Sequence, residues 1–194
     1  MNSASFFAHL PDVVTSRLRL RRLTMNDVPD MYEYCSDPEV ARHVMWDAHT
    51  HISDTRSYLR YVMRQYRGGE PSSWGIEHRQ LRKLIGTIGF MWIQREHNSA
   101  EVGYSLSRAF WNQGLMTEAL IATLDVGFNQ LLLNRIEAQH EVANPASGVV
   151  MRKAGMSCEG RLRSRLYNKG RYVDVDLYAV LRQDFVSRVG RPGI

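Results

Sequence analysis

Three strand-like segments follow one another in the middle of the chain, and a helical segment comes directly after them. The segments SWGIEHR (73–79), KLIGTIGFMWIQ (83–94) and AEVGYSLS (100–107) are rich in β-branched and aromatic residues. The turns RQLR and REHNS separate them. Such a succession is typical of an antiparallel meander. The helix predicted over 114–129 follows the last strand after a short turn, so the fold must join this meander to helices.

The rest of the chain alternates between strand and helix periodicity. Apolar residues alternate in four further segments, 17–23, 135–142, 157–167 and 171–182, which we expect to be strands. Helical spacing begins after Thr24 and again near Ser53. The order predicts a mixed α/β fold with a central, largely antiparallel sheet flanked by helices. No repeat or linker interrupts the 194 residues, which indicates a single domain over 1–194.

Local signals mark the ends of several elements. Thr24 is a plausible helix N-cap, with Asp27 completing part of a capping box. NPASGVVMRKAG (144–155) predicts a short helix with Asn144 as N-cap, Pro145 in its first turn and Gly155 as terminator. Asn-Lys-Gly at 168–170 predicts a hairpin turn between the last two strands.

Charge limits the partners only loosely. The formal net charge is +5 and the isoelectric point is near 9.4, which is compatible with anionic ligands such as nucleotide cofactors. The basic runs at 17–22 and 160–165 alternate with apolar residues, as solvated strand faces do. A basic nucleic-acid-binding protein is an alternative, but no recognition motif supports it.

The cysteine pattern and the lack of targeting segments in the sequence favour a location in the cytoplasm. Cys35 and Cys158 are far apart and match no metal or redox spacing, which is typical of a reducing compartment. The first residues lack the basic start and apolar core of a signal peptide. No apolar run approaches the roughly 18 residues of a membrane span. We therefore expect a cytoplasmic protein with no membrane partner.

The stretch FWNQGLMTEAL (110–120) places a polar, glycine-containing turn where a helix begins. The first N–H groups of a helix have no internal partner, and the helix dipole favours negative charge there. Gly114 would let a phosphate approach without a Cβ in the way. The turn is therefore either simple punctuation or an anion site.

With its neighbouring segments, this stretch resembles the GNAT (GCN5-related N-acetyltransferase) family, and within it the ribosomal-protein-alanine N-acetyltransferases. The likeness covers about residues 15–186. The segments that carry it are TSRLRLRRL (15–23), MWDAHT (45–50), LIGTIGF (84–90), AEVGYSLSRAFWNQGLMTEAL (100–120), NPASGVVMRKAGMSCEGRLR (144–163) and DVDLYAVLRQDF (174–185).

The resemblance implies an acetyl-CoA-dependent N-acetyltransferase in which the cofactor lies in a cleft beside a splayed strand. Backbone groups of Tyr104, Ser105 and Leu106 would bind the pantetheine arm as an added strand does. Asn144 would also touch the cofactor. The diphosphate would be bound by the backbone N–H groups of the turn and the first helical residues, Asn112, Gln113, Gly114, Leu115, Met116 and Thr117.

The sequence departs from the family pattern at informative positions. The broad family begins this turn with Arg or Gln and ends it with Gly or Ala, where this chain has Trp111 and Met116. An aromatic residue at the first position favours the ribosomal-protein subgroup. Met151 stands where many relatives carry a tyrosine that protonates the thiolate. The subgroup often uses a serine instead, and Ser147 matches it.

The expected reaction is direct attack of a neutral amine on the thioester in a ternary complex. An N-terminal amine has a pKa near ~8 and a lysine near ~10.4, so a general base helps at neutral pH. We predict Ser147 as the proton donor, with local backbone bonding as its alternative role. We predict Glu101 as the base, although it could be a solvated strand carboxylate. His140 is the competing base, or a core histidine.

The acceptor and the oligomeric state stay open. A protein or peptide N-terminus is the first choice of acceptor, and an aminoglycoside, polyamine or other small amine is the alternative. A catalytically silent CoA-binding module is a more distant one. We expect no metal, although His49 and His51 with two nearby aspartates could be interpreted as a metal cluster. Trp46 in this loop could line an acceptor pocket or pack in the core, as could Tyr32, Tyr34 and Trp92. The protein is expected to be a monomer or homodimer.

Overall fold

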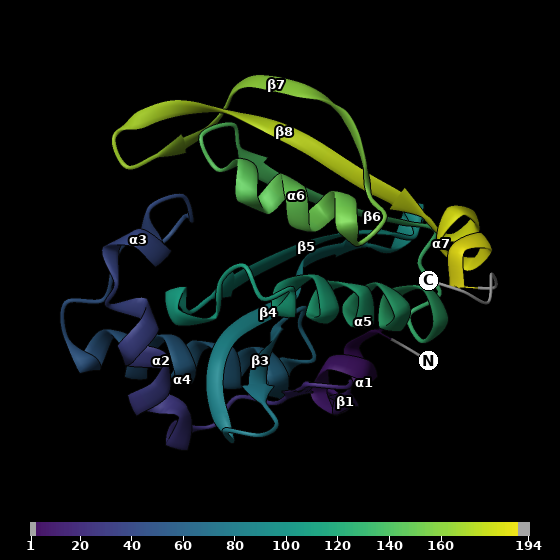
Figure 1. Ribbon diagram of the computed structural model, residues 1–194. Helices are drawn as coiled ribbons and strands as arrows, with labels where there is room; N and C mark the ends of the chain where they lie inside the picture. Colours follow the sequence, from purple (N-terminus) through teal and green to yellow (C-terminus); the bar gives the residue numbers. More distant parts are fainter. Residues whose placement is uncertain (1–2, 190–194) are drawn as a thin grey trace.

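A single eight-stranded sheet passes through the computed structural model, which describes residues 3–189; residues 1–2 and 190–194 of the expected domain lie outside that range. The strand order is β1-β2-β3-β4-β5-β6-β8-β7 (Figure 1). The strands are β1 (Val13–Val14), β2 (Leu18–Arg21), β3 (Ser73–His78), β4 (Lys83–Gln94), β5 (Ser99–Leu106), β6 (Arg135–Glu141), β7 (Ser157–Asn168) and β8 (Arg171–Leu181). All neighbours pair antiparallel except β5 and β6, which confirms the predicted mixed, largely antiparallel sheet.

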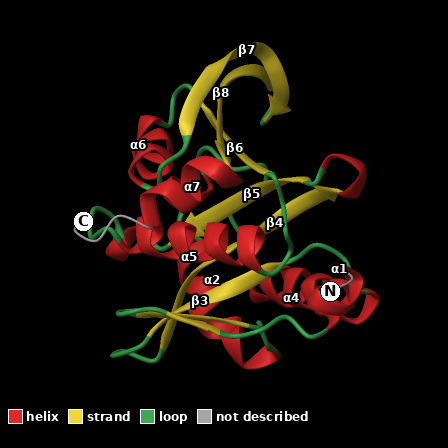
Figure 2. Cartoon of the chain, turned by 90° about the vertical axis from the view of Figure 1, so that its right-hand side faces the viewer, coloured by secondary structure: helices red, strands yellow, loops and turns green. Residues whose placement is uncertain are grey.

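Helices cover both faces of this sheet. They are α1 (Ser3–Ala8), α2 (Val28–Cys35), α3 (Pro38–Ala41), α4 (Ile52–Gly68), α5 (Leu115–Asn129), α6 (Pro145–Lys153) and α7 (Arg182–Val189), with 3₁₀ turns at 25–27, 95–97 and 108–110. Helices α2 and α4 pack together on one face and α5 lies on the other (Figure 2). The predicted inner face of α5 is buried, from Met116 to Phe128. Its apolar stripe therefore fixes how α5 sits on the sheet.

The sheet splits between its two parallel strands. Strand β5 pairs with β6 only where residues 99–101 face residues 135–137. Beyond that point β5 continues beside β4 as far as Leu106, whereas β6 continues beside β8 as far as Glu141. The two strands therefore diverge, and the edge of β5 from Val102 onward has no strand partner on the β6 side. A cleft in the middle of the sheet follows from this pairing.

The ends of the predicted elements are largely confirmed. Asp27 accepts a hydrogen bond from the Thr24 backbone N–H at 2.7 Å, as the capping box requires. The hairpin turn holds Lys169 and Gly170 at φ of 49° and 80°, and the Gly155 terminator has φ of 96°. The last predicted strand ends one residue early, because α7 begins at Arg182.

Several short elements were not predicted. The helices α1, α3 and α7 and the two-residue strand β1 are absent from the sequence-based assignment. Each covers too few residues to show a clear period, and α1 is placed by two buried phenylalanines, Phe6 and Phe7. Their presence extends the sheet and covers its edge without changing the predicted class.

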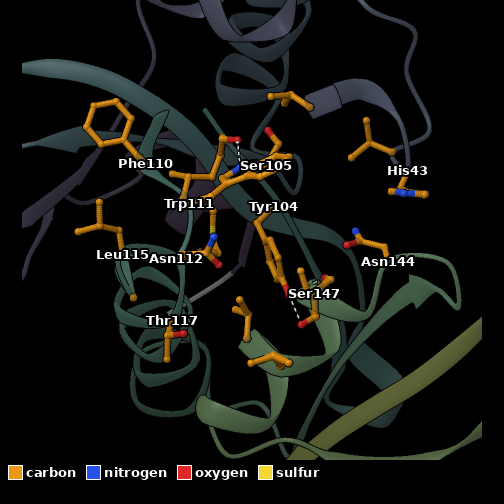
Figure 3. Close-up of a pocket in the computed structure, with 18 of the residues that line it drawn as sticks. His43, Tyr104, Ser105, Phe110, Trp111, Asn112, Leu115, Thr117, Asn144 and Ser147 are labelled. Carbon is orange, nitrogen blue, oxygen red and sulfur yellow. Dashed lines mark hydrogen bonds between the residues drawn. The ribbon is translucent and has the colours of Figure 1, made fainter. Parts of the chain in front are cut away.

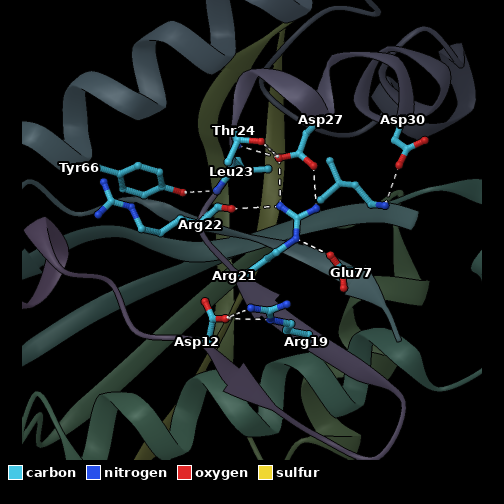
Figure 4. Close-up of polar contacts among 11 residues, drawn as sticks. Asp12, Arg19, Arg21, Arg22, Leu23, Thr24, Asp27, Asp30, Tyr66 and Glu77 are labelled. Atoms are coloured by element: carbon cyan, nitrogen blue, oxygen red, sulfur yellow. Dashed lines mark hydrogen bonds and ion pairs between the residues drawn. The ribbon is translucent and has the colours of Figure 1, made fainter. Parts of the chain in front are cut away.

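The basic run at 17–22 is tied to the protein itself. Arg21 forms ion pairs with Asp27 and Glu77, and Arg19 pairs with Asp12 (Figure 4). The guanidinium of Arg22 stacks 4.5 Å from the centre of the Tyr66 ring. The hydrogen bonds that Arg21 donates to Asp27 raise the pKa of Arg21, although its partial burial opposes this. These arginines therefore connect strands to helices, instead of forming a free anion-binding face.

Candidate active site

A cavity of about 480 Å³ lies along the free edge of β5 and extends over the first turn of α5 and over α6. It brings together most of the residues predicted to form the site. The predicted residues that line it are Tyr104, Ser105, Leu106, Asn112, Gly114, Leu115, Met116, Thr117, Asn144 and Ser147. Gln113 and Glu101, also predicted, are not part of the lining.

The turn before α5 has a backbone shape suited to an anion. Asn112 and Gly114 both adopt left-handed conformations, with φ of 60° and 75°. The first helical hydrogen bond runs from the Glu118 N–H to the Gly114 carbonyl, at 3.0 Å. The N–H groups that precede Glu118 in α5 are those that a helix leaves without internal partners. Together the turn and the helix start form a concave set of donors, of the kind that binds phosphate groups.

Neighbouring side chains hold this turn in place. The Trp111 indole donates to the Leu106 carbonyl at 2.8 Å, which ties the turn back to the end of β5. Arg17 donates to the Gln113 carbonyl at 2.9 Å and forms an ion pair with Glu118 at 2.7 Å. The Gln113 backbone therefore faces Arg17, which explains its absence from the cavity lining.

Glu118 connects the start of α5 to residues 15–17. Its carboxylate accepts from the hydroxyls of Thr15 and Ser16 and from the backbone and side chain of Arg17. Partial burial raises the pKa of Glu118, but these hydrogen bonds outweigh it and lower the pKa to about 2. The carboxylate is therefore ionised at neutral pH, close to the helix N-terminus where negative charge is favoured.

The edge of β5 supplies backbone groups to the cavity. Tyr104, Ser105 and Leu106 pair on one side with Ile88, Thr87 and Gly86 of β4. On the other side β6 has already diverged, so the strand edge faces open space. An extended chain, such as a pantetheine arm, can be bound there by main-chain hydrogen bonds.

Two hydroxyl groups meet where β5 and α6 approach each other. The Tyr104 hydroxyl lies 2.9 Å from Ser147 Oγ and 3.2 Å from the Ser147 carbonyl oxygen (Figure 3). Burial raises the pKa of Tyr104, although the hydrogen bond with Ser147 opposes it. The Ser147 hydroxyl is thus engaged with a side chain from another element, instead of with the local backbone.

Asn144 occupies the N-cap position of α6, as predicted. Its side chain makes no capping hydrogen bond, and it lines the cavity instead. The amide is therefore presented to whatever fills the cavity, which suits the predicted contact with the cofactor better than simple capping. Figure 3 shows Tyr104 and Ser147 between Leu115 on one side and Asn144 on the other.

The two candidate bases lie elsewhere. Glu101 accepts from the Trp92 indole at 2.8 Å and from the Gln139 amide at 3.1 Å, at the point where β5 still pairs with β6. His140 is buried, and its Nδ1 lies 2.7 Å from the Glu141 carbonyl oxygen. Neither side chain lines the cavity, so the geometry gives no support to either as the base.

The loop that could be interpreted as a metal cluster has local structural roles. His49 Nδ1 lies 2.7 Å from the Thr55 hydroxyl, and Asp54 accepts from the backbone N–H groups of Thr50 and His51 at the start of α4. Within residues 3–189, no group of three or more His, Cys, Asp or Glu side chains is arranged to hold a metal ion. The aromatic residues considered for an acceptor pocket, Tyr32, Tyr34, Trp46 and Trp92, are not in the cavity lining.

Three ionisable residues in the lining were not predicted from the sequence. Glu39 and His43 come from α3 and the segment after it, and Lys153 ends α6. Because α3 has only four residues, no periodicity marks it in the sequence. None of the helices within residues 3–189 is both long and apolar enough to cross a membrane.

The splayed parallel pair, the anion-binding turn and the paired hydroxyls together match an acetyltransferase cleft. A family model for the acetyltransferase (GNAT) domain matches residues 17–157. The chain therefore belongs to the GNAT family and is an acetyl-CoA-dependent N-acetyltransferase. This confirms the resemblance found in the sequence.

The similarity of this chain to known proteins extends over nearly its whole length. It is 33% identical over 173 residues to the uncharacterized N-acetyltransferase p20 of Bacillus licheniformis, covering 89% of this chain and 97% of that protein. It is 24% identical over 181 residues to the [ribosomal protein uS5]-alanine N-acetyltransferase of Escherichia coli, covering 89% and 92%.

Solved structures confirm the fold. A GNAT-family acetyltransferase from Bacillus anthracis superimposes with a TM-score of 0.80 at 28% identity, covering 89% of this chain and 99% of that one. RimL, described as a ribosomal L7/L12 alpha-N-protein acetyltransferase in complex with coenzyme A, gives a TM-score of 0.78 at 24% identity, covering 87% and 96%.

Proposed function

We propose that this chain acetylates the N-terminal amine of a protein or peptide. The observation that carries the proposal is the cavity along the free edge of β5, where the Tyr104–Ser147 hydroxyl pair lies between the turn before α5 and the residues after α3. Two similar proteins, the uS5-alanine acetyltransferase and RimL, are described as acting on ribosomal proteins, which supports the acceptor class.

In this proposal the cofactor contacts follow the geometry of the cavity. The turn from Asn112 to Gly114 and the first residues of α5, Leu115, Met116 and Thr117, bind the diphosphate through backbone N–H groups. The free edge of β5 at 104–106 binds the pantetheine arm, and the Asn144 amide binds near its end. Met116, buried in the lining, narrows the cleft where the family has a small residue. Bound acetyl-CoA supplies the activated acetyl thioester.

The protein contributes proton transfer and charge stabilisation. Ser147 donates a proton to the leaving thiolate, with Tyr104 orienting its hydroxyl. A backbone N–H on the unpaired edge of β5 stabilises the oxyanion, and such preorganised donors are a large term in catalysis of this kind. Both roles need a hydroxyl or N–H that faces the cavity, which the placement of Ser147 and of the β5 edge provides.

The charges of the lining favour an N-terminus over a polycation. Within residues 3–189, Glu39 is the only carboxylate in the lining, and it forms an ion pair with Arg42 at 3.1 Å. His43 and Lys153 bring basic groups instead. A polyamine or an aminoglycoside carries several positive charges and would be better bound by several carboxylates. A single ammonium followed by a neutral or acidic peptide fits this lining.

The test combines cofactor binding with turnover. Acetyl-CoA binding is measured by calorimetry, and thiol release is followed with peptides starting in alanine or serine, with spermidine and with kanamycin. We expect turnover with a peptide class, reduced at least tenfold in Ser147→Ala while acetyl-CoA affinity is retained. The exposed Ser157 gives a matched Ser157→Ala control, which should behave as wild type. Turnover of the small amines alone would reject the proposed acceptor class.

A further inference from the structure

His43 faces the cavity from the segment that follows α3. Leu115 lies on one side of Tyr104 and Ser147, and His43 lies on the other side, near Asn144 (Figure 3). Its side chain is 22% exposed, and its Nδ1 lies 3.1 Å from Glu141 Oε2 at the end of β6. One ring nitrogen therefore contacts a carboxylate, while the side chain of His43 also forms part of the cavity lining.

Glu141 is built into the protein as an acceptor. Its side chain is 4% exposed and also accepts from the Asn168 amide at 2.5 Å, with Arg171 Nη2 at 3.5 Å. A carboxylate oxygen accepts hydrogen bonds, so we assign a proton to the His43 Nδ1 that faces it. Asn168 and Arg171 already provide partners for this carboxylate. A neutral His43 protonated on Nδ1 therefore satisfies the site and leaves Nε2 with its lone pair.

The segment that carries His43 is held rigidly. Lys169, in the turn between β7 and β8, donates to the carbonyl oxygens of Val44 and Trp46, each at 2.9 Å. Asn168 donates to the Val44 carbonyl at 3.3 Å as well as to Glu141. The hairpin turn thus fixes both the histidine and its carboxylate. Such preorganisation is what a base needs in order to receive a proton in one geometry.

We propose that His43 is the general base of the acetyl transfer, and that Glu141 is the residue that positions it. This rests on the proposed function in one respect, that the acceptor is an amine protonated near neutral pH. His43 Nε2 takes one proton from the acceptor ammonium, and the neutral nitrogen then forms the C–N bond as the C–S bond breaks. The nitrogen loses its second proton as the amide forms, the thiolate gains one through Ser147, and one proton in total passes to solvent.

Charged groups from four parts of the chain lie around His43 and bear on any pH profile. From the α3 side they are Glu39 and Arg42, which pair with each other. From β6 and β8 they are Glu141 and Arg171, and from the hairpin turn Lys169, which lies 3.6 Å from the exposed Asp47.

The kinetic test uses His43→Gln with a peptide starting in alanine or serine as the acceptor. At pH 7 we expect kcat/KM to fall about 100-fold, within the usual range for loss of a general base. The deficit should shrink above pH roughly 8, because an N-terminal amine then deprotonates without help. The acetyl-CoA dissociation constant should change less than twofold. His97→Gln, at an exposed histidine outside the cavity, is the matched control. An equal loss at all pH values, or none, would overturn the assignment.

A second measurement needs no acceptor. Long-range ¹⁵N–¹H correlation spectra, with His43 identified by its loss in His43→Gln, report which ring nitrogen carries the proton at pH 8. We expect Nδ1–H with a bare Nε2 in wild type, and loss of this preference in Glu141→Gln, whose folding is checked by thermal melting. A proton on Nε2 in wild type would overturn the proposal.

The two measurements separate the possible failures. If no peptide is turned over but acetyl-CoA binds, the proposed acceptor class fails, and the tautomer alone decides on His43. If a peptide is acetylated equally well by wild type and His43→Gln at every pH, the proposed function stands and the base is not His43.

Discussion

The Tyr104 hydroxyl and the Ser147 hydroxyl lie 2.9 Å apart, at the junction between β5 and α6. Burial raises the pKa of Tyr104, so the phenol keeps its proton at neutral pH. It can give that proton to the Ser147 hydroxyl or to the Ser147 carbonyl, 3.2 Å away. When the phenol donates to the Ser147 hydroxyl, the Ser147 proton is left to point into the cavity. Tyr104 therefore orients the proposed donor without being consumed itself.

Tyr104→Phe tests this orientation. The ring and its packing are retained and only the hydroxyl is lost, so the fold should be unaffected. A net hydrogen bond is worth about 1 kcal/mol, which corresponds to roughly a fivefold decrease in kcat. Acetyl-CoA affinity, measured by calorimetry, should stay within twofold. The decrease should be smaller than that in Ser147→Ala. An effect in Tyr104→Phe as large as in Ser147→Ala would instead make the phenol itself the donor.

Gly114→Ala tests the diphosphate turn. Gly114 has φ of 75°, and a Cβ there would meet only Arg17 Nη2, at 3.6 Å. Space is therefore available, and the cost is backbone strain of roughly 1 kcal/mol in a left-handed conformation. We expect acetyl-CoA to bind about five- to tenfold more weakly, because the turn relaxes away from the shape that aims its N–H groups. Calorimetry with coenzyme A measures this directly.

The matched control for that change is Gly68→Ala in the last turn of α4. Its Cβ would make an ordinary contact with Glu70 at 3.5 Å, and its φ is not positive. Alanine there should leave coenzyme A binding unchanged and raise the melting temperature slightly. Equal affinity of both variants for coenzyme A would argue against the turn as the diphosphate site.

The sequence was sufficient for the fold class because long segments carried clear periods. The meander from 73 to 107 and the helix after Gly114 were predicted in the right order. The parallel pairing of β5 with β6 was not, because it joins residues more than thirty positions apart and depends on how α5 crosses the sheet. Yet that pairing, and the point where it stops, creates the cleft.

Only part of the candidate site could be predicted, because only part of it lies in local sequence motifs. Ser147 and the turn at 112–114 lie in local motifs, so a linear pattern could indicate them. The sequence could not show whether the side chains of Glu101 and His140 reach the cavity. Tertiary partners such as Trp92 hold them away from it. His43 lies on a segment fixed by the distant Lys169, and no local pattern predicts that contact.

Glu118→Gln tests how the start of α5 is anchored. The pKa of Glu118 is lowered to about 2 in the folded protein, so the stability that it contributes is present above the ordinary pKa near 4.5 and is lost as pH falls toward 2. Because Glu118 is only partly buried and the side chain of its partner Arg17 is 46% exposed, we discount this to about 1 kcal/mol at pH 7. The variant should melt several degrees lower than wild type at pH 7. The difference should vanish between pH 4.5 and 2, and a difference that stays constant would contradict this account.

Glu101→Gln separates a catalytic carboxylate from a structural one. The side-chain oxygen of the new glutamine can still accept from the Trp92 indole, which donates to Glu101 at 2.8 Å. Its side-chain nitrogen takes the place of the carboxylate oxygen that accepts from Gln139. If Glu101 only ties β4, β5 and β6 together, kcat/KM for an alanine peptide should fall less than about threefold, with the pH profile unchanged. Glu101→Ala should remove both contacts and lower stability by about 1–3 kcal/mol, because the indole N–H loses its partner. A decrease of about 100-fold in Glu101→Gln at pH 7, shrinking at higher pH, would restore Glu101 as the base and exclude His43 from that role.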